Sequence, residues 1–535
     1  MNTRERWILA AVVLGSAIVF LDATVVNVAL PAIGRDLPSS LFGRLEAQSY
    51  VYTGYLLSLS ALLILAGALN DYFGRRRMFA IGLSGFGITS ILCGLAPNME
   101  FLIVARIAQG ATGALLVPGS LSLITANFEG EQRGRVFGIW AGASAATSIL
   151  GPFVGGLLVQ SISWRAAFFI NVPLLAIAIY ATVRHVPESR DEQASGSFDW
   201  LGALVVALAV GGLSFGAIRG QEQQWQDPLA FWALGVGVVA TIAFPFLMRV
   251  SRNPLVPLEL FKSRNFSVTN LSTLVIYGAL YVNGYFVGLY IQGTVGYSAA
   301  AAGIAGIPAS ILLALFSSRF GGLAGRYGSR WFMTIGPLIM GIGILWLLRF
   351  PIDSKPWALD LSRPETLLPP TSYIVDVFPA WLIFGLGLTM MVAPLTTALM
   401  ASVPSRNSGL ASAINNAVSR VGPQLAGAAI YVAITASFYP DIARLVPGTD
   451  ASSAELRHLI APLNPPAPGT PEAIAAAARQ ASTDAFHLAM AVSAALLFAG
   501  AIVNWIGIRD PKRGSEEQHG RAPEAERSEA ADAAS

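Results

Sequence analysis

Cysteine, histidine and charge are scarce in this chain of 535 residues, which has one cysteine, Cys93, and four histidines. A single cysteine excludes an internal disulfide and a cysteine-based metal site, and no metal is expected. Charged residues make up only 12% of the sequence, whereas soluble domains have about 25%. So few charges cannot cover a surface that faces water, and the mean hydropathy of +0.59 agrees with this. The composition therefore predicts an integral membrane protein.

Sequence patterns of several other protein classes are also missing. The apolar runs are long, so they predict helices rather than the alternating strands of about ten residues in outer-membrane barrels. No Walker loop, metal-ligand cluster or nucleophile–base pattern occurs, so neither an enzyme nor an ATP-driven pump is indicated, and no cofactor is expected. The net charge of +3 gives no reason to expect a nucleic-acid partner. The first apolar run, about 25 residues without a small-residue cleavage site, is predicted to be a span and not a signal peptide.

Long apolar runs are what the sequence has in abundance. A membrane-spanning helix needs about 20 mostly apolar residues. Fourteen runs qualify: 7–31, 47–70, 77–96, 99–124, 136–160, 164–184, 199–218, 227–249, 268–293, 300–320, 331–350, 376–400, 409–436 and 484–508. An even number puts both termini on one side, and 22 of the 34 Lys and Arg residues fall on that side. Because short cytoplasmic loops are enriched in these residues, both termini are predicted to be cytoplasmic.

Two loops resemble each other and predict an internal duplication. The segments GALNDYFGRRR (67–77) and GGLAGRYGSR (321–330) share the form G-x-L-x-x-x-x-G-x-R, 254 residues apart. That separation is too long for a solenoid and fits two homologous halves of a transporter. The predicted domains are an N-terminal six-helix bundle (1–184), cytoplasmic linkers with two additional transmembrane helices (185–265), a C-terminal six-helix bundle (266–508) that includes an outer loop (437–483), and a disordered cytoplasmic tail (509–535). Within the outer loop, Thr470 as N-cap and Pro471 as first helical residue predict a short surface helix.

Four ordered segments resemble motifs of the major facilitator superfamily, in particular its fourteen-span drug:proton antiporter branch of the EmrB and QacA type. They are the first-half loop above, LDATVVNVALP (21–31) in the first span, FLIVARIAQGATGA (101–114) in the fourth and LGPFVGG (150–156) in the fifth. The resemblance implies an all-α major facilitator fold, with two six-helix bundles and two extra central helices. It also implies a place in the inner membrane of a bacterium, alternating access, and the proton gradient as energy source.

Asp22 is an acid in the middle of an apolar span, where a carboxylate costs roughly 2.5–3.5 kcal/mol. It shares a helix face with Ala11, Gly15 and Ala29, and small residues are typical of a face that packs against protein. Arg106 lies at a similar depth along the fourth span and cannot lose its charge. We therefore predict that Arg106 modulates Asp22, which couples proton release to substrate entry. The alternatives are a purely structural carboxylate and an arginine that only braces its own span.

The first-half loop is predicted to act at the cytoplasmic mouth. Gly67 and Gly74 are expected to allow a tight turn, and Asp71 to cap a helix N-terminus. The family resemblance implies that Asp71 and Arg75 form a latch that keeps the inward gate shut. The second-half loop has Gly325 where the first has Asp71, so only the first loop can make these charged contacts.

The fifth-span motif lacks side chains along one helix face, at Gly151, Gly155 and Gly156, while Pro152 bends the helix. Such a face allows close contact with a neighbouring helix, which we expect to belong to the other half. The resemblance implies a role in sealing the outer gate. Ordinary packing of small residues is the alternative.

Polar residues inside spans are candidates for lining a substrate cavity. In the ninth span Tyr277 and Tyr281 lie one turn apart and could line a cavity for an aromatic compound, although core packing or an interfacial belt is equally common. In span 13 Arg420 lies near Asn416, and substrate contact and structural pairing are both open. The complete set of candidates is Asn27, Tyr55, Gln109, Tyr277, Tyr281, Asn283, Asn416 and Arg420.

The predicted function is a proton-coupled antiporter that exports hydrophobic or cationic drugs. Its partners would be the small organic substrate, protons and the lipid bilayer. Export of an endogenous lipid or metabolite on the same scaffold is the main alternative. A proton-coupled peptide importer would carry a paired acidic motif in its first span, which is missing, and a receptor would carry a large soluble domain. A periplasmic adaptor protein stays open as a partner, because some relatives in double-membrane bacteria work with one.

Overall fold

The computed structural model describes residues 1–40, 44–190, 198–222, 225–359, 363–451, 453, 456, 459–467 and 469–510, and every regular element within them is a helix. The first half contains α1 (Thr3–Asp36), α2 (Arg44–Phe73), α3 (Arg75–Gly94), α4 (Met99–Gly113), α5 (Leu116–Asn127), α6 (Gly130–Ser161), α7 (Ala166–Phe169) and α8 (Asn171–His185). Two helices follow, α9 (Trp200–Glu222) and α10 (Pro228–Val250). The second half contains α11 (Arg264–Gly293), α12 (Ala299–Ala305), α13 (Ile307–Tyr327), α14 (Arg330–Trp346), α15 (Phe378–Ala401), α16 (Ser408–Leu445) and α18 (Glu472–Gly507).

Thirteen helices within the described residues are long and apolar enough to cross a membrane, and each corresponds to a predicted span. The remaining predicted span, the fifth (136–160), lies inside α6, a helix of 32 residues that packs along α1 and α13. The all-helical fold confirms the predicted fold class. Most of the predicted tail, from residue 511 onward, lies outside the described residues.

Helix boundaries depart from the predicted spans at several places. The fourth predicted span is broken between α4 and α5, and the tenth between α12 and α13 at Gly306. The surface helix predicted after Thr470 is wrong as a separate element, because Pro471 is the N-cap of the long helix α18. The outer ends of α16 and α18 instead pack on each other through a small apolar core that includes Phe438, Ile442 and Ala481.

The two halves meet mainly along two pairs of helices, α2 with α16 and α6 with α13. Small residues allow the close approach: a Cβ atom added at Gly138 of α6 would lie 2.7 Å from the backbone oxygen of Ser317. The helices α9 and α10 pack on each other, and α9 also contacts both α2 and α16. The central pair therefore lies beside the seam between the halves.

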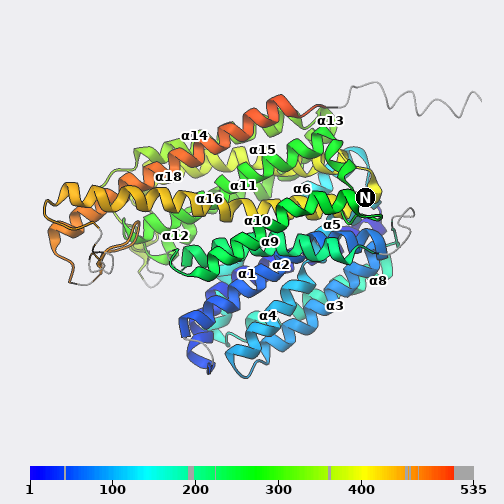
Figure 1. Cartoon of the computed structure of the whole chain (residues 1–535), viewed down its shortest axis with the longest axis horizontal. Helices are drawn as coiled ribbons and strands as arrows, with labels where there is room; N and C mark the ends of the chain where they lie inside the picture. Colours follow the sequence, from blue (N-terminus) through cyan, green and yellow to red (C-terminus); the bar gives the residue numbers. More distant parts are fainter. Residues whose placement is uncertain are drawn as a thin grey trace, which may run out of the picture.

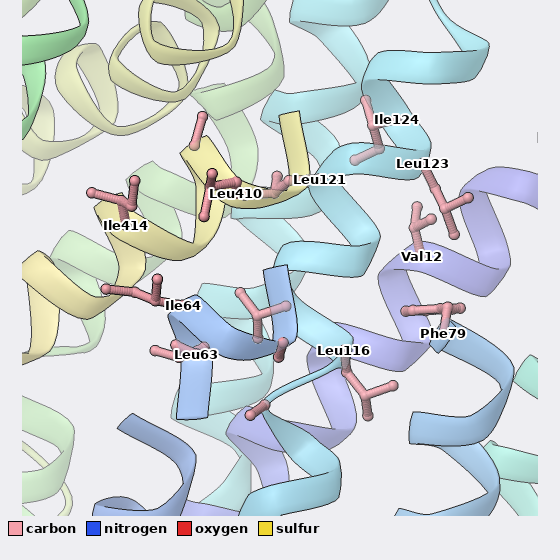
Figure 2. Close-up of a cluster of buried hydrophobic side chains, with 14 of the residues drawn as sticks. Val12, Leu63, Ile64, Phe79, Leu116, Leu121, Leu123, Ile124, Leu410 and Ile414 are labelled. Carbon is pink, nitrogen blue, oxygen red and sulfur yellow. The ribbon is translucent and has the colours of Figure 1, made fainter. Parts of the chain in front are cut away.

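Both the N-terminus and the end of α18 lie at the same end of the bundle (Figure 1). We name it the inner end, which the sequence predicts to be cytoplasmic, and we name the opposite end the outer end. Figure 2 shows part of the apolar core near the inner end, where Leu63 and Ile64 of α2 face Leu410 and Ile414 of α16. Since lipid chains are as apolar as these side chains, their contribution comes from close packing rather than from removal from water.

The duplication predicted from the two loops extends to their capping groups. Gly74 and Gly328, one in each loop, have φ values of 107° and 93°, a conformation that glycine adopts readily. Glu188, just after α8, accepts hydrogen bonds of 3.0 and 3.1 Å from two backbone amides at the start of α3. Asp510, just after α18, accepts bonds of 2.8 and 3.1 Å at the start of α14. In each half, a carboxylate just after the last helix thus holds the start of the helix that follows the repeated loop, α3 or α14.

Candidate functional site

Asp22 lies in the middle of α1 and is completely buried. The small residues on its helix face pack against protein as predicted: Ala11 and Ala29 are also buried, and Gly15 lies against the ring of Phe79. The carboxylate therefore points into the first half of the bundle and not toward lipid.

Three side chains donate hydrogen bonds to this carboxylate from two other helices. Arg106 of α4 forms a buried ion pair with Oδ2 of Asp22. Gln109, one turn further along α4, donates to Oδ1 at 3.0 Å, and Asn171 of α8 donates to the same atom at 3.0 Å. Asp22 and Arg106 are thus in direct contact, and two amide side chains add hydrogen bonds to the carboxylate, while Nη2 of Arg106 is buried with no hydrogen-bond partner among the described residues.

The guanidinium of Arg106 has its own set of neighbours. Its Nε donates to the backbone oxygen of Val51 at 3.2 Å, and its Nη1 donates to Gln109 at 2.8 Å. Its central carbon lies 4.0 Å from the ring centroid of Tyr55, close enough for a cation–π interaction. Tyr55 is held in place by a hydrogen bond from its hydroxyl to the backbone oxygen of Val19. Arg106 therefore both pairs with Asp22 and braces α2.

Asn171 is the residue of this site that the motifs did not indicate. Besides Asp22, its amide donates to the hydroxyl of Ser90 at 3.0 Å, which in turn donates to the backbone oxygen of Phe168 at 2.9 Å. The thiol of Cys93 lies 3.5 Å from Gln109. A lone asparagine in the apolar run FFINVPLL was the available signal, because polar residues inside spans usually have a function.

A second buried carboxylate, that of Asp71, lies at the inner end of the bundle and contacts the other half. Its two oxygens accept hydrogen bonds from the backbone amides of Gly409 and Leu410 at 3.2 and 2.8 Å. These amides begin α16 in the other half, where a negative charge is favourable. Arg75 donates to Asp71 at 3.0 Å and also to the backbone oxygen of Arg406 at 3.1 Å. Asp71 and Arg75 therefore join the two halves, with Asp71 as a helix cap.

The two glycines of the first-half loop have different roles. Gly74 forms the turn between α2 and α3, as its positive φ shows. The prediction that Gly67 allows this turn is wrong, because Gly67 lies inside α2 and faces α16. A Cβ atom at Gly67 would lie 2.6 Å from the backbone oxygen of Gly409 and would clash with Ala413. Gly67 instead permits close contact between the halves.

The glycines of the fifth-span motif face α1, within the same half. A Cβ atom at Gly151 would lie 2.7 Å from Cβ of Thr24, and one at Gly155 would lie 3.1 Å from Cα of Val25. A Cβ at Gly156 would meet no described atom within 4 Å, and the side chain of Pro152 lies outside the described residues. The expectation of a partner helix in the other half is thus wrong for this conformation. The motif places α6 directly against the segment of α1 that follows Asp22.

The predicted cavity residues divide into two groups. Tyr55 and Gln109 are fully buried and belong to the site around Asp22. The others lie elsewhere, with Asn27 exposed, Asn283 buried, and Tyr277, Asn416 and Arg420 half-buried. The side chain of Tyr281 lies outside the described residues. Arg420 is nevertheless close enough to Tyr55 for an electrostatic interaction between the two side chains.

A bundle of membrane-spanning helices in two halves, with a buried ion pair and a contact that closes one end, has the architecture of a transporter. Residues 12–427 match the sequence pattern of the family described as Major Facilitator Superfamily. The chain therefore belongs to the major facilitator superfamily, which confirms the resemblance of its motifs.

Its relatives include drug resistance proteins. The chain is 31% identical to the multidrug resistance protein Stp of Mycobacterium tuberculosis over 452 residues, 84% of this chain and 80% of the relative. It is 31% identical to the tetracenomycin C resistance and export protein of Streptomyces glaucescens over 436 residues, 81% and 76% of the two chains. The solved structure of the proton:xylose symporter XylE bound to 6-bromo-6-deoxy-D-glucose superposes with a TM-score of 0.57 at 16% identity, over 94% of this chain and 96% of that one. That likeness shows the fold alone.

Proposed function

We propose that this protein is a drug efflux transporter that exports hydrophobic or cationic compounds across a bacterial cell membrane in exchange for protons. The names of its relatives support drug efflux. The observation that carries proton exchange is the buried contact between Asp22 and Arg106. Asp22 is the only acid that lies more than one turn inside any predicted span. It is therefore the group best placed to carry a proton through the membrane.

Protonation of Asp22 would change the forces at the site. The ionised carboxylate attracts Arg106 and accepts bonds from Gln109 and Asn171. A proton on Asp22 removes the attraction and leaves Arg106 with Gln109, the carbonyl of Val51 and the ring of Tyr55. Two protonation states thus favour two arrangements of α1 against α4 and α8. If a ligand binds one arrangement more tightly than the other, its binding is coupled to protonation of Asp22.

Alternating access is supported by the contacts at the inner end. The bonds from Asp71 to the start of α16 and the close packing at Gly67 hold the halves together there. Opening of the inner end requires these contacts to break. The glycine face of α6 lies against α1 next to Asp22, so a shift of α1 on protonation would act directly on α6.

A drug-susceptibility panel in an efflux-deficient bacterial host tests the proposed function. Expression of the protein should lower susceptibility to several hydrophobic or cationic compounds, and a protonophore or the Asp22→Asn variant should abolish the protection. Absence of a shift for every compound would contradict drug efflux and favour the alternative of an endogenous lipid or metabolite. A pull-down from a double-membrane host tests for a periplasmic adaptor.

A further inference from the structure

Arg420 is a half-buried arginine with no partner for its charge. It lies on α16 eleven residues after Gly409, about 16 Å along the helix from the contact with Asp71, and thus well inside the membrane span. Its guanidinium makes no hydrogen bond and no ion pair within the described parts of the chain. By contrast, Arg75, Arg106 and Arg219 each pair with an aspartate. Because arginine cannot lose its proton, an unpaired charge at this depth requires an explanation.

The second half has no carboxylate that could move to Arg420. The sequence has no Asp or Glu in residues 264–350, 377–440 or 485–509, which include nearly all of the membrane-spanning helices of this half. The next acid on α16 is Asp441, about 30 Å further along the helix. In the first half, Asp22 and Asp71 are engaged by Arg106 and Arg75. No free carboxylate of these membrane-spanning segments is therefore available to pair with Arg420.

The surroundings of Arg420 lie at the seam between the halves. Its charge interacts with the phenol of Tyr55 on α2, the same residue whose ring lies 4.0 Å from Arg106. Asn416, one turn before Arg420 on α16, is also half-buried. Two guanidinium groups, one from each half, thus act on a single tyrosine. Because Asp22 balances the charge of Arg106, Arg420 supplies the uncompensated positive charge at this seam, which attracts anions and repels cations.

We propose that Arg420 binds an anionic oxygen group of the transported compound, such as a carboxylate, phenolate or phosphate on an amphipathic molecule. A guanidinium matches such groups with two parallel hydrogen bonds, which a neutral or cationic ligand cannot offer. The inference rests on the proposed export of organic compounds. Within that proposal, it favours hydrophobic compounds that carry an acidic group over cationic ones. Arg420 and the ion pair of Asp22 remain separate sites, so an anion can bind while Arg106 stays paired. An inside-negative membrane potential assists the exit of an anion as well as the entry of a proton.

Calorimetric titration of the purified full-length protein with three matched probes tests this assignment. The probes are naphthylacetate, its neutral methyl ester, and naphthylethylammonium. We expect naphthylacetate to bind about tenfold or more tightly than the other two, since hydrogen bonds to charged groups are among the strongest in proteins. Arg420→Gln should remove this preference, and Arg420→Lys should keep part of it. Arg444→Gln is the control, because Arg444 is an exposed arginine of the same helix that pairs with Asp441.

Several results would overturn the assignment. One is that the wild-type protein binds the cation or the ester as tightly as it binds naphthylacetate. This measurement does not depend on the folding of any variant. Another is an unchanged preference in Arg420→Gln.

Competition by a short-chain phosphatidylglycerol, with phosphatidylcholine as control, identifies the source of the anion. Displacement supports a lipid phosphate, and no displacement supports a small organic acid. Since the titration uses no proton gradient, its outcome is independent of whether transport is proton-coupled.

Discussion

Donors from two other helices converge on the side chain of Asp22 inside the helix bundle. Arg106 supplies the opposite charge at Oδ2, while Gln109 and Asn171 each donate a hydrogen bond of 3.0 Å to Oδ1. In an apolar environment neither charge would be tolerated alone, so each residue is stable only while the other is present. The pair can therefore serve as a switch, because a proton on Asp22 changes the stability of the whole cluster.

Removal of one member of the pair should destabilise the protein. Asp22→Asn leaves Arg106 buried without a counter-charge, so we expect a loss of about 3–5 kcal/mol in the free energy of unfolding. The double variant Asp22→Asn with Arg106→Gln removes the remaining charge and should recover much of the loss. Thermal unfolding of the purified protein in detergent measures both. Equal unfolding temperatures for wild type and Asp22→Asn would contradict the structural role of the pair.

At the residue level, the sequence predicted the charged members of the site but not all of its donors. Asp22 and Arg106 could be placed at one depth by counting residues along two spans, since a helix rises by a fixed amount per residue. Gln109 was assigned to a cavity because its neighbours on other helices could not be known. Asn171 comes from α8, and its contact with Asp22 depends on packing between helices far apart in the sequence.

The helices α2 and α16 pack closely between the two halves, and we propose that closure of the inner end depends on this contact. Gly67→Ala would place a Cβ atom 2.6 Å from the backbone oxygen of Gly409, closer than packed atoms allow. We expect the halves to separate at the inner end and transport to fall by about tenfold or more, since overpacking typically costs about 1–3 kcal/mol. Labelling of a cysteine introduced at Ser412, which is buried, should become faster.

Gly156→Ala is the matched control, because a Cβ atom there meets no described atom within 4 Å. It should leave both transport and labelling unchanged. If Gly67→Ala labels at the wild-type rate and transports normally, the packing between these helices does not control the inner gate.

The helices α9 and α10 are tied to the outer end of α2 by a cluster of polar groups. Arg219 of α9 pairs with Asp227, the N-cap of α10, and donates to the hydroxyl of Tyr50 on α2 at 2.7 Å. The backbone amide of Leu229, and then Arg219, hold the pKa of Asp227 below its usual value of 3.8. A lowered pKa means that the stabilisation is present above pH 3.8 and is lost as the pH falls through the lower, folded-state value.

Acid should therefore loosen this attachment. Between pH 6 and 3 the unfolding temperature of wild type should fall further than that of Asp227→Asn, so the difference between the two proteins should shrink. Glu259→Gln is a suitable control, because Glu259 is an exposed acid paired only with Lys262 at 3.5 Å. A constant difference between wild type and Asp227→Asn across this range would exclude a pH-dependent role for Asp227.

The sequence predicted helical elements well and their ends less well. Apolar runs continue across Gly113 and Gly306, so hydropathy alone could not show the breaks between α4 and α5 or between α12 and α13. The outer extensions of α16 (437–445) and α18 (472–483) were missed because each includes charged and polar residues that are untypical of a membrane span. They are helical because they pack on each other in the outer core around Phe438 and Ile442.

The whole molecule combines a duplicated frame with unequal chemistry in its halves. The capping carboxylates Glu188 and Asp510 repeat, but Asp71 has no counterpart because Gly325 occupies its place. The first half carries the buried acid Asp22, and the second half carries the unpaired cation Arg420. If both proposals hold, proton exchange takes place in the first half and recognition of substrate charge in the second. The loop repeat made the frame predictable, whereas the partners across the seam depend on tertiary packing.

Proton flux in reconstituted vesicles tests the central claim, that Asp22 couples transport to protons. The protein is reconstituted with a pH-sensitive dye inside, and the compound with the largest effect in the susceptibility panel is added. We predict a substrate-dependent proton flux for wild type and for Glu259→Gln, and none for Asp22→Asn, although that variant still binds the compound. A substrate-dependent proton flux in Asp22→Asn equal to that of wild type would contradict the account.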